Sequence, residues 1–221
     1  MAVFVDTAVI ADIAQISAAY PIAGVTTNPT ILLAALDKGQ RLSDTEVLRG
    51  LLEVTSGPVF MQPVADGPDA LYKAAAEYGA VDPERVVAKL PATSTGLRAA
   101  RDLARDGIQF AFTAVGSVAQ AYLGALAGAR WVIPYFCRLR QTGVDVSQII
   151  FDMSHLLDSQ KTSTRILAAS LKTPNDIIEA TLAGAHDVTA PPGVIEAMLR
   201  HSMTEAAVKQ FTEDWQRVLH A

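Results

Sequence analysis

The sequence contains little cysteine and no clustered metal-binding residues. Its single cysteine, Cys137, cannot form a disulfide within the chain. No cysteine and histidine pairs stand at the spacing of a zinc site. A disulfide framework and a structural zinc site are therefore excluded, and we expect a protein that works in a reducing compartment.

Positive charge and export signals are also scarce. The 18 lysine and arginine residues are outnumbered by 23 aspartate and glutamate residues, so no basic field favours nucleic acid. The N-terminus has no early lysine or arginine, and Asp6 interrupts what would be the apolar part of a signal peptide. We expect a cytoplasmic protein that binds no nucleic acid.

One stretch, 110–129, is uncharged and about as long as a membrane span. It contains threonine, serine, glutamine and glycine residues, and its first part has the β-branched and aromatic character of a strand. A buried strand followed by a buried helix explains this pattern better than a membrane span does. We therefore expect no membrane association.

Short apolar runs alternate with longer segments of helical periodicity, which is typical of parallel strands joined by helices. Strands are expected at 2–6, 23–28, 58–62, 85–91, 108–113, 130–135, 165–170 and 186–190. Helical patterns between them include 95–105, 117–127, 146–159 and 174–182. Eight such units predict a single α/β domain over residues 1–221, a (β/α)8 TIM barrel.

An open, doubly wound sheet is the alternative architecture. It is disfavoured because no Gly-x-Gly-x-x-Gly follows the first strand and no Walker-type loop occurs. Beyond the eighth unit, 203–219 is expected to form an extra C-terminal helix with an apolar stripe that includes Phe211 and Trp215. This stripe must pack on its own barrel or on a neighbouring subunit.

Each expected strand ends in a polar residue, and catalysis in such barrels occurs at these carboxyl ends. The residues are Asp6, Thr26 with Asn28, Gln62, Lys89, Thr113, Tyr135, Ser170 and Thr189. A purely structural barrel could carry any soluble residue there, so the pattern by itself is moderate evidence.

Lys89 is the sharpest single signal, because it alone among the lysines lies inside a strand. Strand alternation places it on the face of Val87 and opposite Val86, Ala88 and Leu90, so it points into the barrel if those three face the helices. Burial lowers the pKa of an ammonium and makes a nucleophilic amine accessible. Lys89 is therefore either a Schiff-base nucleophile or a lysine that is paired with Asp6 or extended to the rim.

Several segments together resemble a known family. They are DTA at Asp6, GVTTNPT at 24–30, the strand ending in Gln62, VVAKLPAT around Lys89, FTAV around Thr113, PYFCR at 134–138, AASLKT at 168–173 and FTEDWQ in the last helix. Their order and character resemble the transaldolase family, and more narrowly its small fructose-6-phosphate aldolase branch. The resemblance runs nearly from end to end.

This resemblance implies a class I aldolase barrel that uses no metal and no cofactor. It implies that Lys89 forms the Schiff base, that Asp6 lies close to it, and that Thr26 and Asn28 hold substrate hydroxyls. It further implies that Gln62, Thr113 and Tyr135 hold a catalytic water, and that Arg138 and Ser170 bind phosphate. The guanidinium geometry of arginine and the late strand ends of barrels both suit a phosphate.

Within the family, Gln62 and Tyr135 match the aldolase branch, whereas transaldolases tend to carry Glu and Phe at these positions. The expected reaction is reversible cleavage of fructose 6-phosphate into dihydroxyacetone and glyceraldehyde 3-phosphate. The alternatives are a transaldolase that transfers the dihydroxyacetone unit and a sugar-phosphate binding protein without turnover. The resemblance also implies a homo-oligomer, a pentamer or decamer.

Three residues depart from the aldolase pattern. Cys137 replaces the usual Asn, Arg140 stands where Asp is common, and Gly116 stands where an aromatic residue is usual. These changes bear on acceptor preference and on the charge near the phosphate. With no histidine placed near it, Cys137 is expected to be a small rim or core residue. Lys172 could add charge near the phosphate, but plain solvent exposure is the favoured expectation for an isolated lysine.

Overall fold

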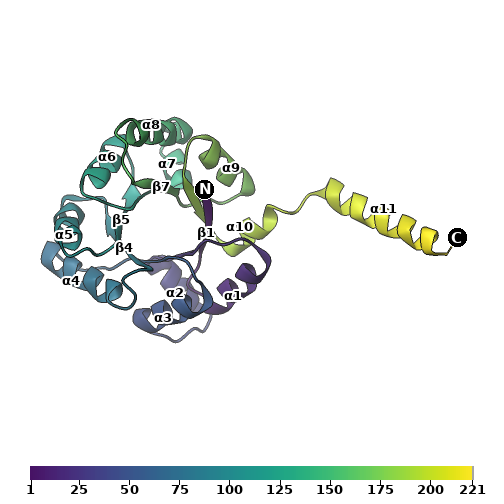
Figure 1. The fold of residues 1–221 in the computed structure, drawn as a ribbon, viewed down its shortest axis with the longest axis horizontal. Helices are drawn as coiled ribbons and strands as arrows, with labels where there is room; N and C mark the ends of the chain where they lie inside the picture. Colours follow the sequence, from purple (N-terminus) through teal and green to yellow (C-terminus); the bar gives the residue numbers. More distant parts are fainter. Residues whose placement is uncertain (221) are drawn as a thin grey trace.

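The computed structural model describes residues 1–220 and forms a closed barrel of eight parallel strands in the order β1 to β8 (Figure 1). The strands are β1 (Ala2–Asp6), β2 (Val25–Thr26), β3 (Val59–Met61), β4 (Val86–Pro91), β5 (Phe110–Val115), β6 (Trp131–Pro134), β7 (Arg165–Ala168) and β8 (Asp187–Ala190). The eight-stranded TIM barrel is confirmed, and the open-sheet alternative is wrong because β1 also pairs with β8.

Helices surround the barrel, except for the last one, which extends away from it (Figure 1). They are α1 (Ile10–Ala19), α2 (Pro29–Asp37), α3 (Asp44–Val54), α4 (Pro68–Gly79), α5 (Ser94–Arg105), α6 (Val118–Leu126), α7 (Phe136–Arg140), α8 (Val146–Ser159), α9 (Pro174–Leu182), α10 (Pro192–Ala197) and α11 (Ser202–Leu219). Side-chain caps begin several of them, including Asn28 on α2 and Thr93 on α5. Expected and observed strand boundaries differ mostly by one or two residues, and β2 is the shortest at Val25–Thr26.

Strand alternation divides the core into two parts. Val86, Ala88 and Leu90 pack with the helices, whereas Val87 belongs to the smaller cluster inside the barrel. Phe4, Phe60 and Trp131 fill that interior, with ring centroids 5.0 to 6.4 Å apart in edge-to-face contact. The barrel is therefore a packed core and not a pore.

A charge network centred on the buried Asp187 lies at the amino-terminal end of the barrel strands. Asp187 accepts hydrogen bonds from Trp131 Nε1 at 3.0 Å and from Arg165 Nε at 2.6 Å. Both partners lie at the start of their strands, away from the polar strand ends. The open space of the barrel is therefore at its carboxyl end.

Two backbone irregularities occur at that end. The pairing of β5 with β6 shifts register between Thr113 and Val115, and Ala114 between them has a φ of 57°. Ser170, just beyond β7, has a φ of 62°. Such values are costly for residues other than glycine and tend to occur at functional sites.

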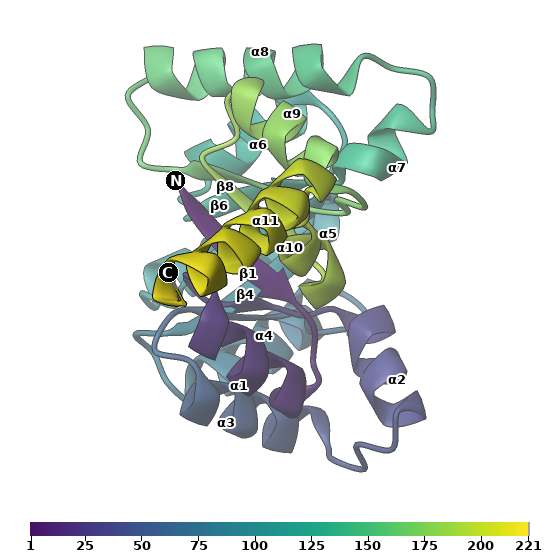
Figure 2. The same cartoon turned by 90° about the vertical axis from the view of Figure 1, so that its right-hand side faces the viewer.

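Helix α11 stands apart from the barrel beyond α10 (Figures 1 and 2). None of its residues is buried, and Phe211 is 70% exposed. Over residues 1–220, no helix combines the length and apolar character needed to cross a membrane.

Candidate active site

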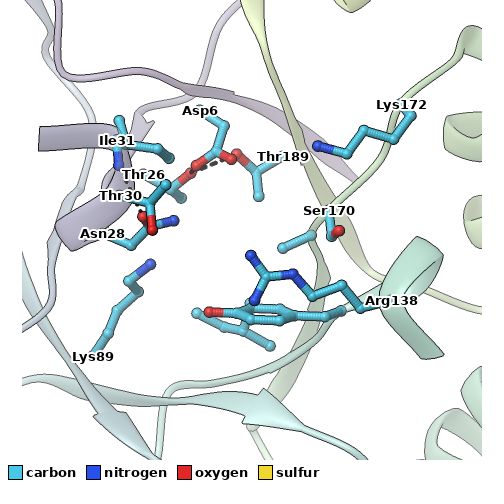
Figure 3. A pocket seen from close by; sticks show the side chains of 13 residues that line it. Asp6, Thr26, Asn28, Thr30, Ile31, Lys89, Arg138, Ser170, Lys172 and Thr189 are labelled. Carbon is cyan, nitrogen blue, oxygen red and sulfur yellow. Dashed lines mark hydrogen bonds between the residues drawn. The ribbon is translucent and has the colours of Figure 1, made fainter. Parts of the chain in front are cut away.

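A cavity of about 130 Å³ opens at the carboxyl ends of the strands (Figure 3). It is lined by Asp6, Thr26, Asn28, Thr30, Ile31, Lys89, Ile133, Tyr135, Arg138, Ala169, Ser170, Lys172 and Thr189. These residues come from β1, β2, β4, β6 and β8, from α2 and α7, and from the segments that precede α2 and α7 and follow β7. Closure of the sheet therefore brings together side chains that are far apart in sequence.

The cavity contains most of the residues that the sequence predicted for the site. Asp6, Thr26, Asn28, Lys89, Tyr135, Arg138 and Ser170 all line it. Thr113 does not, but its hydroxyl lies 2.9 Å from the Tyr135 hydroxyl. Gln62 is also outside the lining, and its Oε1 atom is buried without a hydrogen-bond partner. The structure thus gathers seven of the nine predicted residues around the cavity, whereas Gln62 and Thr113 are not part of its lining.

Lys89 lies on β4 with its side chain 3% exposed, and its amine extends toward Asn28 (Figure 3). Burial lowers the pKa of Lys89 to about 8, although the negative charge of Asp6 opposes this shift. Near neutral pH an appreciable fraction of the amine is therefore uncharged. A lysine in this state can attack a carbonyl carbon.

Asp6 ends a short chain of hydrogen bonds across the cavity. The Thr26 hydroxyl donates to Asp6 Oδ1 at 2.6 Å and lies 2.6 Å from the Thr189 hydroxyl. Because Thr26 has only one proton to donate, Thr189 donates to Thr26. Burial raises the pKa of Asp6, while Lys89 and Thr26 partly offset this rise. Because its pKa is raised, Asp6 is a carboxyl group suited to accept and return a proton.

Asn28 serves both the fold and the cavity. Its Oδ1 accepts a hydrogen bond from Ile31 N at 3.0 Å and thereby caps α2. This bond fixes the side chain and leaves the Nδ2 donor to the cavity, where Figure 3 shows it beside Lys89. The cap therefore orients a hydrogen-bond donor next to the amine.

The opposite side of the cavity is cationic. The Arg138 guanidinium lies over the Tyr135 ring, 4.8 Å from its centroid, a stacking arrangement that limits its freedom. Ser170 and Lys172 approach from the segment after β7, and Figure 3 shows the Lys172 amine turned toward the cavity. Two positive groups and a hydroxyl can together bind a phosphate.

Comparison with known proteins supports the same interpretation. Residues 3–221 match the family described as Transaldolase/Fructose-6-phosphate aldolase. The chain belongs to this family. A protein named "Probable transaldolase" from Symbiobacterium thermophilum is 35% identical, covering 98% of this chain and 97% of the relative. Proteins of the same name from Dinoroseobacter shibae and Thermus thermophilus are 37% and 33% identical, covering 98% and 99% of this chain.

Two solved structures share the barrel architecture at low sequence identity. An inosine 5' monophosphate dehydrogenase from Legionella pneumophila has a TM-score of 0.51 at 19% identity, covering 70% of this chain. A mandelate oxidase mutant has a TM-score of 0.58 at 11% identity, covering 87% of this chain. This chain spans 49% and 64% of those two proteins. At these identities the likeness concerns the fold alone.

Other lining residues were not singled out for the site. Lys172 is exposed, as expected, but it also lines the cavity, so the expectation of plain solvent exposure was incomplete. Thr189 was noted only as a strand end, and the polarity pattern could have placed it in the site. Thr30, Ile31 and Ile133 gave no chemical signal, because only the fold brings them to the cavity wall.

The three departures from the aldolase pattern lie outside the cavity lining. Arg140 turns to α9, where it binds Asp176 and Glu179 at 2.7 Å each. Cys137 is partly buried against the core. Burial raises the pKa of its thiol, and the negative charge of Asp176 raises it further. A Cβ at Gly116 would meet only Gln120 and Leu139 at 3.5 Å or more, so the fold leaves room for a side chain there.

Residues 1–220 hold no group of three or more histidine, cysteine, aspartate or glutamate residues arranged to bind a metal. Of the residue types that commonly bind metals, only Asp6 lines the cavity. The cavity lining therefore combines amine, carboxyl, hydroxyl and guanidinium groups.

Proposed function

We propose that this protein is a class I aldolase that reversibly cleaves fructose 6-phosphate into dihydroxyacetone and glyceraldehyde 3-phosphate. One observation carries the proposal: Lys89 is a buried lysine with a pKa of about 8, and it lines the same cavity as Arg138 and Lys172. The amine would react with the ketone, and the cationic side of the cavity would bind the phosphate. Membership of the transaldolase and fructose-6-phosphate aldolase family is consistent with this chemistry.

The reaction begins when the neutral Lys89 amine attacks the ketone carbon, and loss of water leaves a protonated imine. A base then removes the proton of the hydroxyl next to the scissile bond, a role that Asp6 is placed to support. The carbon–carbon bond breaks, its electrons move to the imine nitrogen, and glyceraldehyde 3-phosphate leaves. The enamine that remains takes a proton on carbon, and water hydrolyses the imine to free dihydroxyacetone and Lys89.

A water molecule relays protons in these steps. The Tyr135 hydroxyl lies 2.9 Å from Thr113, and the buried Gln62 Oε1 has a free acceptor position. Together they can hold a water near the imine, with Gln62 accepting a hydrogen bond but taking no proton. A tyrosine hydroxyl can donate a proton to the enamine, which favours release of the ketone.

Transaldolase activity is the second candidate, because relatives such as the Symbiobacterium thermophilum protein carry the name "Probable transaldolase". Both reactions form the same enamine on Lys89. They differ in whether the enamine is protonated and hydrolysed or waits for an acceptor aldehyde. Gln62 and Tyr135 are the residues on which the aldolase assignment depends.

The Schiff-base assignment is tested by borohydride reduction in the presence of dihydroxyacetone. We expect the reduced ketone on Lys89 alone, found by mass spectrometry of the digest, and no label in Lys89→Met. Label on another lysine would contradict the assignment. Absence of both label and turnover would indicate a binding protein without catalysis.

Aldolase and transaldolase activities are separated by a coupled assay for glyceraldehyde 3-phosphate with fructose 6-phosphate as substrate. We expect product without any acceptor aldehyde. Tyr135→Phe should lower this cleavage more than about tenfold, equivalent to about 1.4 kcal/mol, and should spare transfer to erythrose 4-phosphate. If wild-type product appears only when the acceptor is added, the protein is a transaldolase and our interpretation of Gln62 and Tyr135 is wrong.

A further inference from the structure

Asp176, outside the cavity, joins the two segments that carry the cationic groups. It lies in the first turn of α9 and is 5% exposed. Its Oδ2 atom accepts hydrogen bonds from the backbone N–H groups of Lys172 at 3.0 Å and Thr173 at 2.8 Å. Its Oδ1 atom accepts from Arg140 at 2.7 Å. One carboxylate thus binds the segment after β7 and the helix after β6.

The segment after β7 depends on this carboxylate for its shape. Ser170 has a φ of 62°, an unfavourable conformation for a side chain with a Cβ. Before it, Ala169 is fixed by its N–H bond to Pro134 at 3.0 Å. After it, Leu171 is fully buried and Lys172 is held through its backbone N–H by Asp176. Asp176 therefore fixes the far end of the segment that presents Ser170 and Lys172 to the cavity.

The other contact holds α7, which spans only Phe136–Arg140. Arg140 lies over the Phe136 ring at 4.7 Å and reaches Asp176 with one nitrogen and Glu179 with the other. Arg138, two residues earlier, points instead over Tyr135 and into the cavity. A helix this short has little stability of its own. Its first residue, Phe136, is fully buried, and Arg140 anchors its last turn on α9, so both anchors contribute to where Arg138 lies.

The charge of Asp176 suits this task. Burial raises its pKa, but hydrogen bonds from Arg140, the Lys172 N–H and Thr173, with the nearby Cys137 thiol, outweigh burial and lower the pKa to about 2. Asp176 therefore stays ionised in any neutral buffer. Two of these partners, Cys137 and Arg140, are positions at which the chain departs from the aldolase pattern, so both departures meet at one buried carboxylate.

We propose that Asp176 is a positioning residue for phosphate recognition, because it holds the segment of Ser170 and Lys172 on one side and the helix of Arg138 on the other, and all three residues line the same cavity. This inference rests on the proposed function, which assigns substrate phosphate to those three residues. Loss of the carboxylate charge weakens both segments together and leaves Lys89 untouched. The effect is therefore specific to phosphorylated substrates.

The test compares KM and kcat for glyceraldehyde 3-phosphate and for unphosphorylated glyceraldehyde in aldol addition to dihydroxyacetone. In Asp176→Asn we expect KM for the phosphorylated aldehyde to rise about tenfold, with kcat and the KM for glyceraldehyde nearly unchanged. Glu179→Gln is the matched control, because it removes the other carboxylate bound to Arg140 and leaves the Asp176 contacts in place. We expect it to change each KM less than about twofold.

A second variant keeps the inference testable if Asp176→Asn does not fold. Arg140→Gln removes the link from α7 and should raise the same KM to a smaller extent. In the double variant the two effects should be less than additive, because they act through one contact. Circular dichroism should show native secondary structure for each variant used.

The possible outcomes separate the inference from the proposed function. Equal KM values for both aldehydes in the wild type, or no reaction, would overturn the proposed function itself. A wild-type preference for the phosphorylated aldehyde that Arg138→Ala removes and folded Asp176→Asn keeps would overturn the role of Asp176. Equal losses for both aldehydes in Asp176→Asn would do the same. If Asp176→Asn does not fold, an unchanged KM in Arg140→Gln overturns the inference.

Discussion

At the scale of single residues, the chemistry of the site depends on how strongly the barrel desolvates one amine. Lys89 is almost fully buried, and Asp6 is the carboxylate that moderates its pKa. The two groups shift in opposite senses, because burial disfavours the charged form of each and their mutual attraction favours it. The pair therefore sets the pH range in which the amine can react.

This balance predicts a pH dependence. The rate of imine formation on Lys89 should rise with pH and level off above about 8, since only the neutral amine attacks. Asp6→Asn removes the attraction that raises the pKa of Lys89, so the midpoint should move to lower pH. The measurement is the initial rate of borohydride-trapped label on Lys89 as a function of pH, with Glu77→Gln on α4 as a distant control. A midpoint that rises in Asp6→Asn would contradict this account of the pair.

Arg138 provides a second prediction at this scale. Arg138→Ala should raise KM for glyceraldehyde 3-phosphate by roughly ten- to a hundredfold, since a hydrogen bond to a charged group contributes about 1.5 to 3 kcal/mol. Unphosphorylated glyceraldehyde should be little affected. Steady-state kinetics with both aldehydes measures the difference, and an equal loss for both would mean that Arg138 has a structural role.

At the scale of elements, the close packing of α5 on the end of β4 holds the strand that carries Lys89. A Cβ on Gly96 would lie 2.0 Å from the carbonyl oxygen of Pro91, the last residue of β4. That oxygen also accepts a hydrogen bond from Thr93 N at 2.8 Å. The helix can approach this closely only because Gly96 has no side chain.

Gly96→Ala should therefore push α5 away from β4. We expect a loss of about 1 to 3 kcal/mol in the free energy of unfolding, seen as a Tm lower by several degrees. Activity should also fall, because Lys89 lies two residues before Pro91. Gly193→Ala is the matched control, since a Cβ there meets nothing within 4 Å. Equal Tm values for the two variants would show that the end of β4 can shift without a loss of stability.

At the scale of the whole molecule, α11 does not contact the barrel core. Its apolar residues Val208, Phe211, Trp215 and Val218 are each more than half exposed, and Figure 1 shows the helix projecting from the barrel. An apolar patch of this kind indicates a protein contact. We expect α11 to pack on a neighbouring copy of this chain in a homo-oligomer.

Phe211→Glu combined with Trp215→Glu should disrupt that packing. The mass from light scattering should fall toward that of one 23.5 kDa chain, while circular dichroism of the barrel stays the same. Thr212→Glu with Gln216→Glu adds the same charge to α11 and should leave the mass unchanged. A wild-type chain that is already monomeric would contradict the expectation.

The sequence by itself determined the barrel and singled out Lys89 as the candidate nucleophile. Short apolar runs alternating with helical segments are typical of parallel strands that are covered on both faces, and the predicted orientation of Lys89 with Val87 agrees with the structure. Polar strand ends identified Asp6, Thr26 and Tyr135, because parallel strands bring their carboxyl ends to one face. Local periodicity and residue type gave these positions, and the family resemblance gave the expected roles.

Tertiary structure alone decided the rest. Closure of β1 on β8 brings Thr189 to Thr26, and the fold turns Lys172 into the cavity and Arg140 away from it. The left-handed backbone at Ser170 and the burial that lowers the pKa of Lys89 to about 8 depend on neighbours from other strands and helices. Such features arise from contacts between segments far apart in the chain, and no local pattern in the sequence specifies them.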